Sequence, residues 1–243
     1  MRTFVWNGYF EDIPSDPECQ NRVQITPLET ARYILQHPEY DPNWQADIPA
    51  LLTCVASAFG TDGIDAIKEQ TWCYAPMGSH TARYASVCAM YYEKTGDTRY
   101  REEAYRFFNF ATYVCEDNGY VWVGPDWKTS WFSDGYGDYI RHFIDGLGAV
   151  PEWAPAGENH LLRSTSVVQR ISYADNGITY KTFDSNAAEV FRLASKPQNI
   201  TVSGSVLPEV PQLTGKGWNW DALENGGVLR VVRDSGNEVK ISY

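Results

Sequence analysis

The chain has 243 residues, of which 43% are hydrophobic, and its 31 acidic and 20 basic side chains leave a net charge of −11. That length and apolar content suffice for a substantial core in one large domain or two modest ones. The acidic balance provides no basic surface for phosphate backbones or anionic lipid, so we expect no nucleic acid and no membrane as partners.

The cysteines show no metal-site signature, because none forms a Cys-x-x-Cys pair or stands at zinc-ligand spacing from a histidine. We therefore predict no metal and no other cofactor. Their odd number and apolar surroundings predict buried free thiols. The five positions are Cys19, Cys54, Cys73, Cys88 and Cys115. The sequence shows neither an apolar run of about 18 residues nor a signal-peptide core, and it leaves the location of the protein open.

The first predicted helix covers residues 26–37, "TPLETARYILQH". Thr26 suits its N-cap and Pro27 its first position, while Glu29 would complete a capping box. A second helix follows and should end at Gly60.

A helical hairpin is predicted next. Residues 78–96, "GSHTARYASVCAMYYEKTG", are apolar nearly all round over residues 84–92, which predicts a helix buried on most sides. Gly96 should end this helix and Asp97 should cap the following one. In residues 97–119 the apolar side chains recur with the helical period, and the charged side chains lie on other sides of the helix. This helix should therefore have one solvent-exposed face. Together they predict an inner and an outer helix packed antiparallel.

The hydrophobic period changes to two from about Ser166. The stretch "SVVQRISYADNGITYKTF" has two alternating runs around Asp175-Asn176-Gly177, a strong hairpin signal. Further strands are expected within residues 189–193, 199–204, 227–234 and 238–243. Six short strands with turn signals indicate an antiparallel sandwich-like module.

The connector "AVPEWAPAGENH" contains two prolines and marks the domain boundary. We expect an α-helical hairpin domain over residues 1–155 and an antiparallel β module over residues 156–243. Helices should occupy residues 26 to 147, and strands should begin near residue 160.

The hairpin signature "YYEKTGDTRYREEAYRF" resembles the (α/α) toroids of six-hairpin glycosidases and some polysaccharide lyases. Residues 177–204 look like the carboxy-terminal β modules that follow the toroid in several of those families. The resemblance implies a multidomain α plus β fold: the helical hairpins of a partial (α/α) toroid, then an antiparallel β-sandwich-like module. About six helices are expected, half of a closed ring. A half ring exposes an apolar flank, which either an N-terminal half of the same polypeptide or a second copy in a homodimer would cover.

In toroids of this kind the ligand binds where loops lead into the inner helices. Residues 6–14, 72–84 and 130–143 have that position, and each combines aromatic rings with charged groups. This composition suits a saccharide, whose C–H faces stack on rings while its hydroxyls need fixed polar partners. The expected substrate-binding residues are Trp6, Tyr9, Trp72, Arg83, Trp131 and Tyr136.

Glycoside hydrolysis needs two carboxyl groups, one to protonate the leaving group and one to attack or to activate water. Asp134 and Asp138 are four residues apart, where like charges repel or share a proton, so a pair of Glu11 with one of them fits better. The candidate catalytic residues are Glu11, Asp134, Asp138 and His80. A lyase would instead use His80 or Tyr136 as the base and Arg83 to neutralise a uronate.

Several candidates also have a structural interpretation. Asp134 suits an N-cap, His80 a hydrogen bond to a neighbouring loop, and Arg83 an internal ion pair. Trp218 and Trp220 alternate at strand spacing and are expected to pack in the β module or at an interface. The sequence thus predicts a carbohydrate-active, glycoside hydrolase-like protein. A polysaccharide lyase and a non-catalytic carbohydrate-binding or assembly protein are the alternatives.

Overall fold

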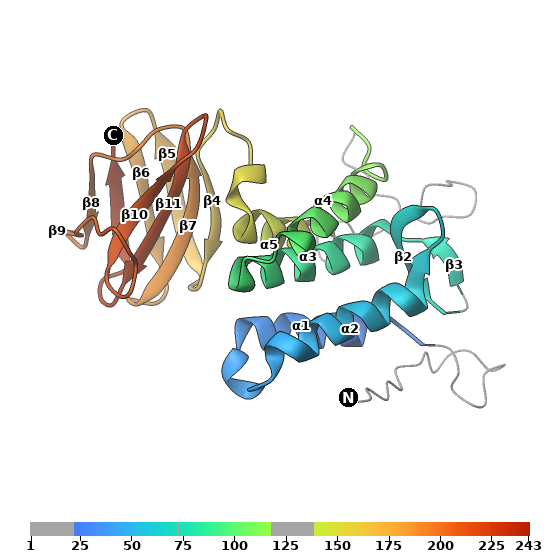
Figure 1. Ribbon diagram of the computed structural model, residues 1–243. Coiled ribbons are helices and arrows are strands. Elements are labelled where there is room, and N and C mark those ends of the chain that lie inside the picture. The colour runs from blue at the N-terminus through green and yellow to red at the C-terminus, as the bar shows by residue number, and fades with distance from the viewer. Residues whose placement is uncertain (1–21, 72, 118–138) are drawn as a thin grey trace. The chain divides into compact units, whose positions relative to one another are not determined.

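The computed structural model describes residues 22–71, 73–117 and 139–243 (Figure 1). The chain divides into two compact units, Met1–Ala149 and Val150–Tyr243. In its described residues the first unit combines five α-helices with a small antiparallel sheet, and the second consists mainly of antiparallel sheets. The predicted mixed α plus β fold, with helices before sheets, is confirmed.

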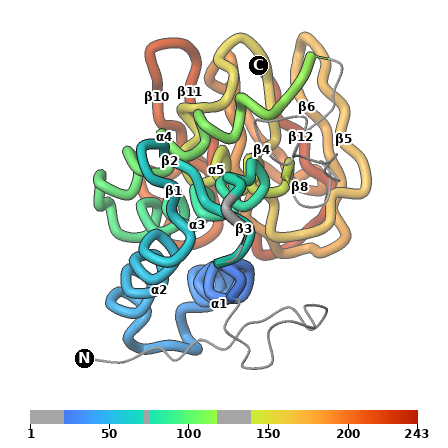
Figure 2. Tube along the Cα trace, turned by 90° about the vertical axis from the view of Figure 1, so that its right-hand side faces the viewer, coloured from blue at the N-terminus to red at the C-terminus, as the bar shows by residue number. Residues whose placement is uncertain are grey.

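The helices of the first unit run in alternating directions. Helices α1, α3 and α5 begin at the same end, and α2 and α4 return toward it (Figure 1). Figure 2 views this unit from the end at which β3 lies, with α1 and α2 neighbouring each other in blue. The elements are α1 (Ile25–Gln36), the 3-10 helix η1 (Pro38–Tyr40), α2 (Trp44–Phe59), α3 (Gly78–Thr95), α4 (Thr98–Thr112) and α5 (Arg141–Ala149).

The ends of the α3–α4 hairpin follow the prediction. Gly96 has a left-handed backbone with φ 73°, which glycine adopts without steric cost, and it ends α3. The Asp97 carboxylate accepts a hydrogen bond from the Arg99 N–H at 3.1 Å and caps α4. The second helix, α2, ends just before Gly60, as expected.

The predicted capping box of α1 is wrong. The helix begins at Ile25, its N-cap is Gln24, and no side chain caps it. Glu29 binds arginines on other helices instead. A charged partner across the unit holds this carboxylate, so it is not available to the first turn of its own helix.

The prediction that helices fill residues 26 to 147 is wrong between α2 and α3. A three-stranded antiparallel sheet lies there, made of β1 (Gly60–Thr61), β2 (Ile64–Gln70) and β3 (Cys73–Pro76). Two hydrogen bonds join the end of β2 to the residues that lead into α1. The Arg22 N–H donates to Thr71 Oγ1 at 2.9 Å, and the Thr71 N–H donates to the Arg22 carbonyl at 3.0 Å. The sheet therefore fixes where α1 begins.

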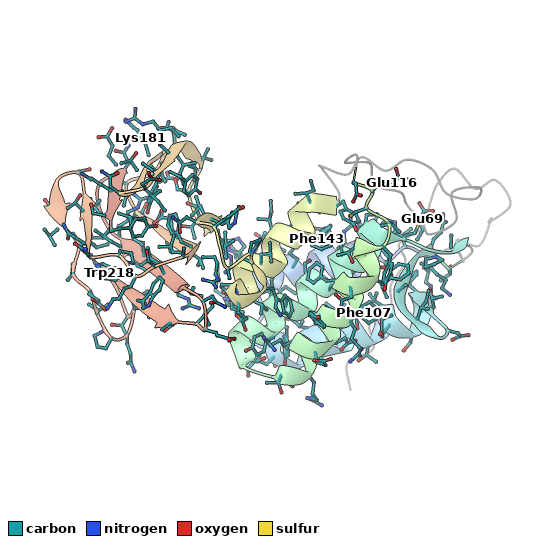
Figure 3. The ribbon with its side chains drawn as sticks, turned by 90° about the horizontal axis from the view of Figure 1, so that it is seen from above. Glu69, Phe107, Glu116, Phe143, Lys181 and Trp218 are labelled. Atoms are coloured by element: carbon teal, nitrogen blue, oxygen red, sulfur yellow. The ribbon has the colours of Figure 1, made fainter. Side chains whose placement is uncertain are left out.

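Helix α3 is the centre of the helical unit. Every residue from Gly78 to Tyr91 is buried, as the all-round apolar pattern predicted. The ring of Tyr84 packs 4.7 Å from that of Phe107 on α4, and Phe108 packs 4.8 Å from Phe143 on α5 (Figure 3). Because the buried stretch includes charged side chains, these need partners inside the unit.

The second unit holds the 3-10 helix η3 (Pro151–Trp153) and two antiparallel sheets. Their orders are β10-β11-β7-β4 and β5-β6-β12-β8-β9. The nine strands are β4 (His160–Ser164), β5 (Val168–Ala174), β6 (Gly177–Thr182), β7 (Ala187–Leu193), β8 (Asn199–Val202), β9 (Ser205–Val206), β10 (Gly217–Ala222), β11 (Gly227–Arg233) and β12 (Glu238–Ser242).

The start of the strands at residue 160 and the hairpin around Asp175-Asn176-Gly177 are confirmed, because the first strand begins at His160 and β5 pairs with β6 across that turn. The count of six strands is wrong. The six expected strand ranges did not include β4, β9 or β10, although the expected start near residue 160 and the strand spacing of Trp218 and Trp220 pointed to β4 and β10. Strand β9 has only two residues, too few for an alternating pattern.

Both sheets contribute to one hydrophobic core. Trp218 on β10 is 3% exposed within it, and its indole N–H donates to the Leu207 carbonyl at 3.0 Å (Figure 3). Trp220 packs against the core while partly exposed. The packing role expected for these tryptophans is confirmed, and Trp218 offers no surface to a sugar.

A buried ion pair lies inside this unit. Arg233 Nη2 lies 2.7 Å from Glu189 Oε1, and both side chains are fully excluded from solvent. The Tyr180 hydroxyl donates to Glu189 at 3.1 Å, and burial, together with the nearby Glu189 charge, raises the pKa of Tyr180 well above its usual range. Because neither charged side chain contacts water, each is stabilised by its charged partner and by hydrogen bonds such as these.

We expect Glu189→Gln to destabilise the protein by about 3 kcal/mol, because it leaves the Arg233 guanidinium buried without a counter-ion. Denaturant unfolding followed by circular dichroism measures the change. The matched control is Glu209→Gln, since Glu209 is half exposed and pairs with Lys196 at 2.7 Å on the surface. The control should change stability by less than about 1 kcal/mol, and equal effects of the two variants would contradict the prediction.

A second prediction concerns the contact between α4 and α5. A Cβ at Gly146 would lie 2.5 Å from the Phe108 ring. Gly146→Ala should therefore destabilise by about 1–3 kcal/mol despite the higher helix propensity of alanine. Gly157→Ala is the control, because a Cβ there meets nothing within 4 Å. A stabilised Gly146→Ala protein in thermal unfolding would show that this contact is not tight.

Candidate functional site

Charged side chains from the first two turns of α1, α3 and α5, together with the residue before α1, form a connected network, which we call the helix-end cluster. Because these helices begin at one end of the unit, their early residues meet although they are far apart in the sequence. The cluster consists of Gln24, Glu29, Arg32, His80, Arg83, Arg141 and Asp145.

Glu29 is the common acceptor of the helix-end cluster. Its Oε1 accepts from Arg83 Nε at 3.1 Å and from Arg141 Nη2 at 2.6 Å, and its Oε2 accepts from Arg32 Nη1 at 3.4 Å. Such charge-assisted hydrogen bonds are stronger than neutral ones. The carboxylate therefore ties α1 to both α3 and α5.

The buried side of the cluster lies on α3. Arg83 is 3% exposed, and its Nη1 donates to His80 Nδ1 at 3.2 Å and lies 3.5 Å from Gln24 Oε1. A guanidinium only donates, so Nδ1 is the acceptor in this contact. The internal ion pair expected for Arg83 is present.

The opposite side of the cluster reaches solvent. The side chains of Arg141, Glu29 and Asp145 are 41%, 32% and 22% exposed. Arg32 Nη2 lies 2.6 Å from Asp145 Oδ2 and closes the network. Among the described residues, the cluster brings together three arginines and two carboxylates.

Tyr139 fixes the start of α5 against the end of α4. Its hydroxyl donates to the Ala111 carbonyl, and the Cys115 thiol donates to it at 3.2 Å. Burial, followed by the contact with Cys115, raises the pKa of Tyr139, which therefore stays protonated as a structural donor. This contact sets the position of Arg141, two residues on.

His80 and Arg83 are the predicted site residues that the structure describes, and it brings them together. The other predicted residues lie outside the described residues. These are Trp6, Tyr9, Glu11, Trp72, Trp131, Asp134, Tyr136 and Asp138.

Five cluster members, including Gln24 before α1, were not predicted as site residues. Glu29 was assigned to a cap, and Arg32, Arg141 and Asp145 were not selected. A signal was available: charges at i,i+3 in Glu29–Arg32 and at i,i+4 in Arg141–Asp145 interrupt otherwise apolar helices. Glu69 on β2 and Glu116 after α4 are further carboxylates toward the same end of the unit (Figure 3).

The cysteines divide by burial. Cys54 and Cys88 lie inside or partly inside the helical unit, whereas Cys115 is exposed, so the prediction of a buried thiol is wrong there. Burial raises the pKa of Cys88 well above its usual range, which keeps that thiol protonated and unreactive. Within residues 22–71, 73–117 and 139–243, no group of three or more histidine, cysteine or acidic side chains is arranged to hold a metal ion. Over the same residues, no helix combines the length and the apolar content needed to cross a membrane.

No protein-family model matches the chain, and a search of curated proteins found no match. A proposal for its function therefore depends on the residues themselves.

We expect Glu29→Gln to destabilise the protein by about 1–3 kcal/mol, because the buried Arg83 loses an ionised acceptor at 3.1 Å. Glu102→Gln removes the same charge from an exposed position on α4 and should change little. Denaturant unfolding compares the two. Equal stabilities would show that Glu29 does not hold the three helices together.

Proposed function

We propose that the protein is carbohydrate-active and binds a saccharide at the end of the helical unit where α1, α3 and α5 begin. The single observation that supports this site is that three helix starts converge on a polar cluster, which is buried on one side and exposed to solvent on the other. Burying charged groups is costly, so a paired cluster of them that also reaches solvent is a candidate for a binding site. Residues 1–21 and 118–138, which hold most of the predicted aromatic and acidic side chains, lead along the chain toward α1 and α5.

We also propose the finer fold class. The alternating directions of α1 to α5 support helical hairpins of the (α/α) toroid type. The single core shared by both sheets supports a β-sandwich in the second unit.

The leading reaction is hydrolysis of a glycosidic bond. One carboxyl among Glu11, Asp134 and Asp138 protonates the glycosidic oxygen, and a second, ionised one attacks the anomeric carbon or activates water. Arg141 and Glu29, at the exposed edge of the cluster, supply a donor and an acceptor for sugar hydroxyls. The network behind them keeps both side chains in place, as a preorganised site requires.

One observation favours a lyase as the second candidate. The cluster is rich in arginine and contains a histidine. In an elimination, Arg141 would neutralise a uronate carboxylate and a nearby base would remove the adjacent carbon-bound proton. A non-catalytic binding protein is the third candidate and would use the same contacts.

The test begins with a panel of neutral and uronate-containing oligosaccharides in a thermal-shift assay. A ligand present at about 100 times its Kd should stabilise the fold by about 2.7 kcal/mol. The stabilising glycan is then incubated with the protein, and new reducing ends are measured. Hydrolysis yields saturated products, elimination yields an ultraviolet-absorbing unsaturated product, and a binding protein yields neither.

Asp134→Asn, Asp138→Asn and Glu11→Gln identify the acids. If two of them act as the pair, each of those two should lower turnover by about 10²–10⁴-fold while the thermal shift persists. Glu102→Gln is the matched control and should leave both readouts unchanged. The proposal is refuted if no glycan stabilises the protein.

A further inference from the structure

The outer face of the five-stranded sheet carries a groove of about 670 Å³ across β5, β6, β12 and β8. Its polar lining comes from Arg170, Ser172, Thr179, Thr201, Glu238 and Lys240. We propose that this groove binds an anionic glycan, a chain whose sugars carry carboxylate or sulfate groups. The inference is independent of the reaction proposed for the helical unit.

The strand register aligns the polar side chains of the groove. Ser172 pairs with Thr179, Thr179 with Lys240, and Lys240 with Thr201, so one row crosses four strands. Neighbouring strands lie about 4.8 Å apart, which makes the row about 14 Å long. It therefore presents three hydroxyls with an ammonium group among them, over a length that accommodates several sugar units.

The charges of this face leave one cation available. Glu238, the acid that lines the groove, already lies 3.1 Å from Arg170 and 3.4 Å from Lys181. Lys240 forms no ion pair with any of the described residues. Three cations against one carboxylate give this face a net charge of +2, opposite in sign to the chain as a whole. A carboxylate or sulfate on a ligand would pair with Lys240.

The end of the groove holds an unusual backbone conformation. Ser203 has φ 47°, in the left-handed region that side chains other than asparagine and aspartate seldom adopt, and Gly204 follows with φ 84°. Both line the groove. A Cβ at Gly236 would lie 2.7 Å from Ser203 Oγ, so the two turns are closely packed. This packing fixes the position of Ser203 at the end of the groove.

The same features favour a glycan over a nucleic acid. Stacking of bases requires exposed aromatic rings, and the one aromatic residue that lines the groove, Tyr180, is 2% exposed and belongs to the core. Phosphate backbones are bound by many cations, whereas this face has three, two of which already pair with Glu238. Sugar hydroxyls, in contrast, match the row of serine and threonine hydroxyls.

Affinity electrophoresis of the full chain provides the test, with polygalacturonate, dextran sulfate and neutral dextran as separate probes. We expect at least one anionic polymer to retard the protein and neutral dextran to have no effect. Polygalacturonate alone would identify a uronate ligand, and dextran sulfate alone a sulfated one. Lys240→Gln should weaken binding about tenfold, the scale of one lost hydrogen bond between charged groups.

Two further variants separate this site, respectively, from a general charge effect and from a loss of structure. Lys196→Gln removes the same charge outside the groove and should bind like the parent protein. Glu238→Gln should bind more tightly, because it releases Arg170 and Lys181, and loss of a structural contact alone would not produce a gain. Retardation by neither anionic polymer, equal binding by Lys240→Gln, or stronger binding of single-stranded DNA than of either anionic polymer would overturn the proposal.

Discussion

The helical unit depends on the pairing of Arg83 with Glu29. Helix α3 is buried over fourteen residues, so the guanidinium of Arg83 cannot find water and must have an ionised partner inside the protein. Glu29 serves this role for Arg83 and at the same time binds Arg32 and Arg141. One carboxylate thus sets the relative positions of α1, α3 and α5, and with them the end of the unit where we place the ligand.

Each unit contains an arginine–glutamate pair, and the two pairs differ in a way that bears on function. Arg233 and Glu189 are both fully buried, and the neighbouring carbonyl and hydroxyl groups complete their hydrogen bonds. No ligand can reach them, so we interpret that pair as structural. Glu29 is 32% exposed. Its network continues to Arg141 at the surface, so the same chemistry that stabilises the helices is within reach of a solute.

The two proposed sites use different physical features for one class of ligand. The helix-end cluster offers charged donors and acceptors fixed by a buried network. The sheet groove offers hydroxyls in a row, positioned by strand register, with Lys240 available for an acidic group. A protein that bound an acidic glycan in the groove would raise its local concentration for a site in the helical unit, as multivalent binding does in general.

Local features were determined by the sequence alone. Each of these features depends on the backbone preferences and the hydrophobic periodicity of a few neighbouring residues, which can be read directly from the sequence. They are the turn at Gly96-Asp97, the burial of α3, the hairpin at Asp175-Asn176-Gly177 and the start of the strands at residue 160. The short sheet β1–β3 escaped prediction because β1 and β3 have only two and four residues, and the sequence of β2, "IDAIKEQ", does not alternate between apolar and polar residues. The helix-end cluster required the tertiary structure. Glu29 is 54 residues from Arg83 and 112 from Arg141, and a partner at that separation is chosen by how helices pack, which no local pattern encodes.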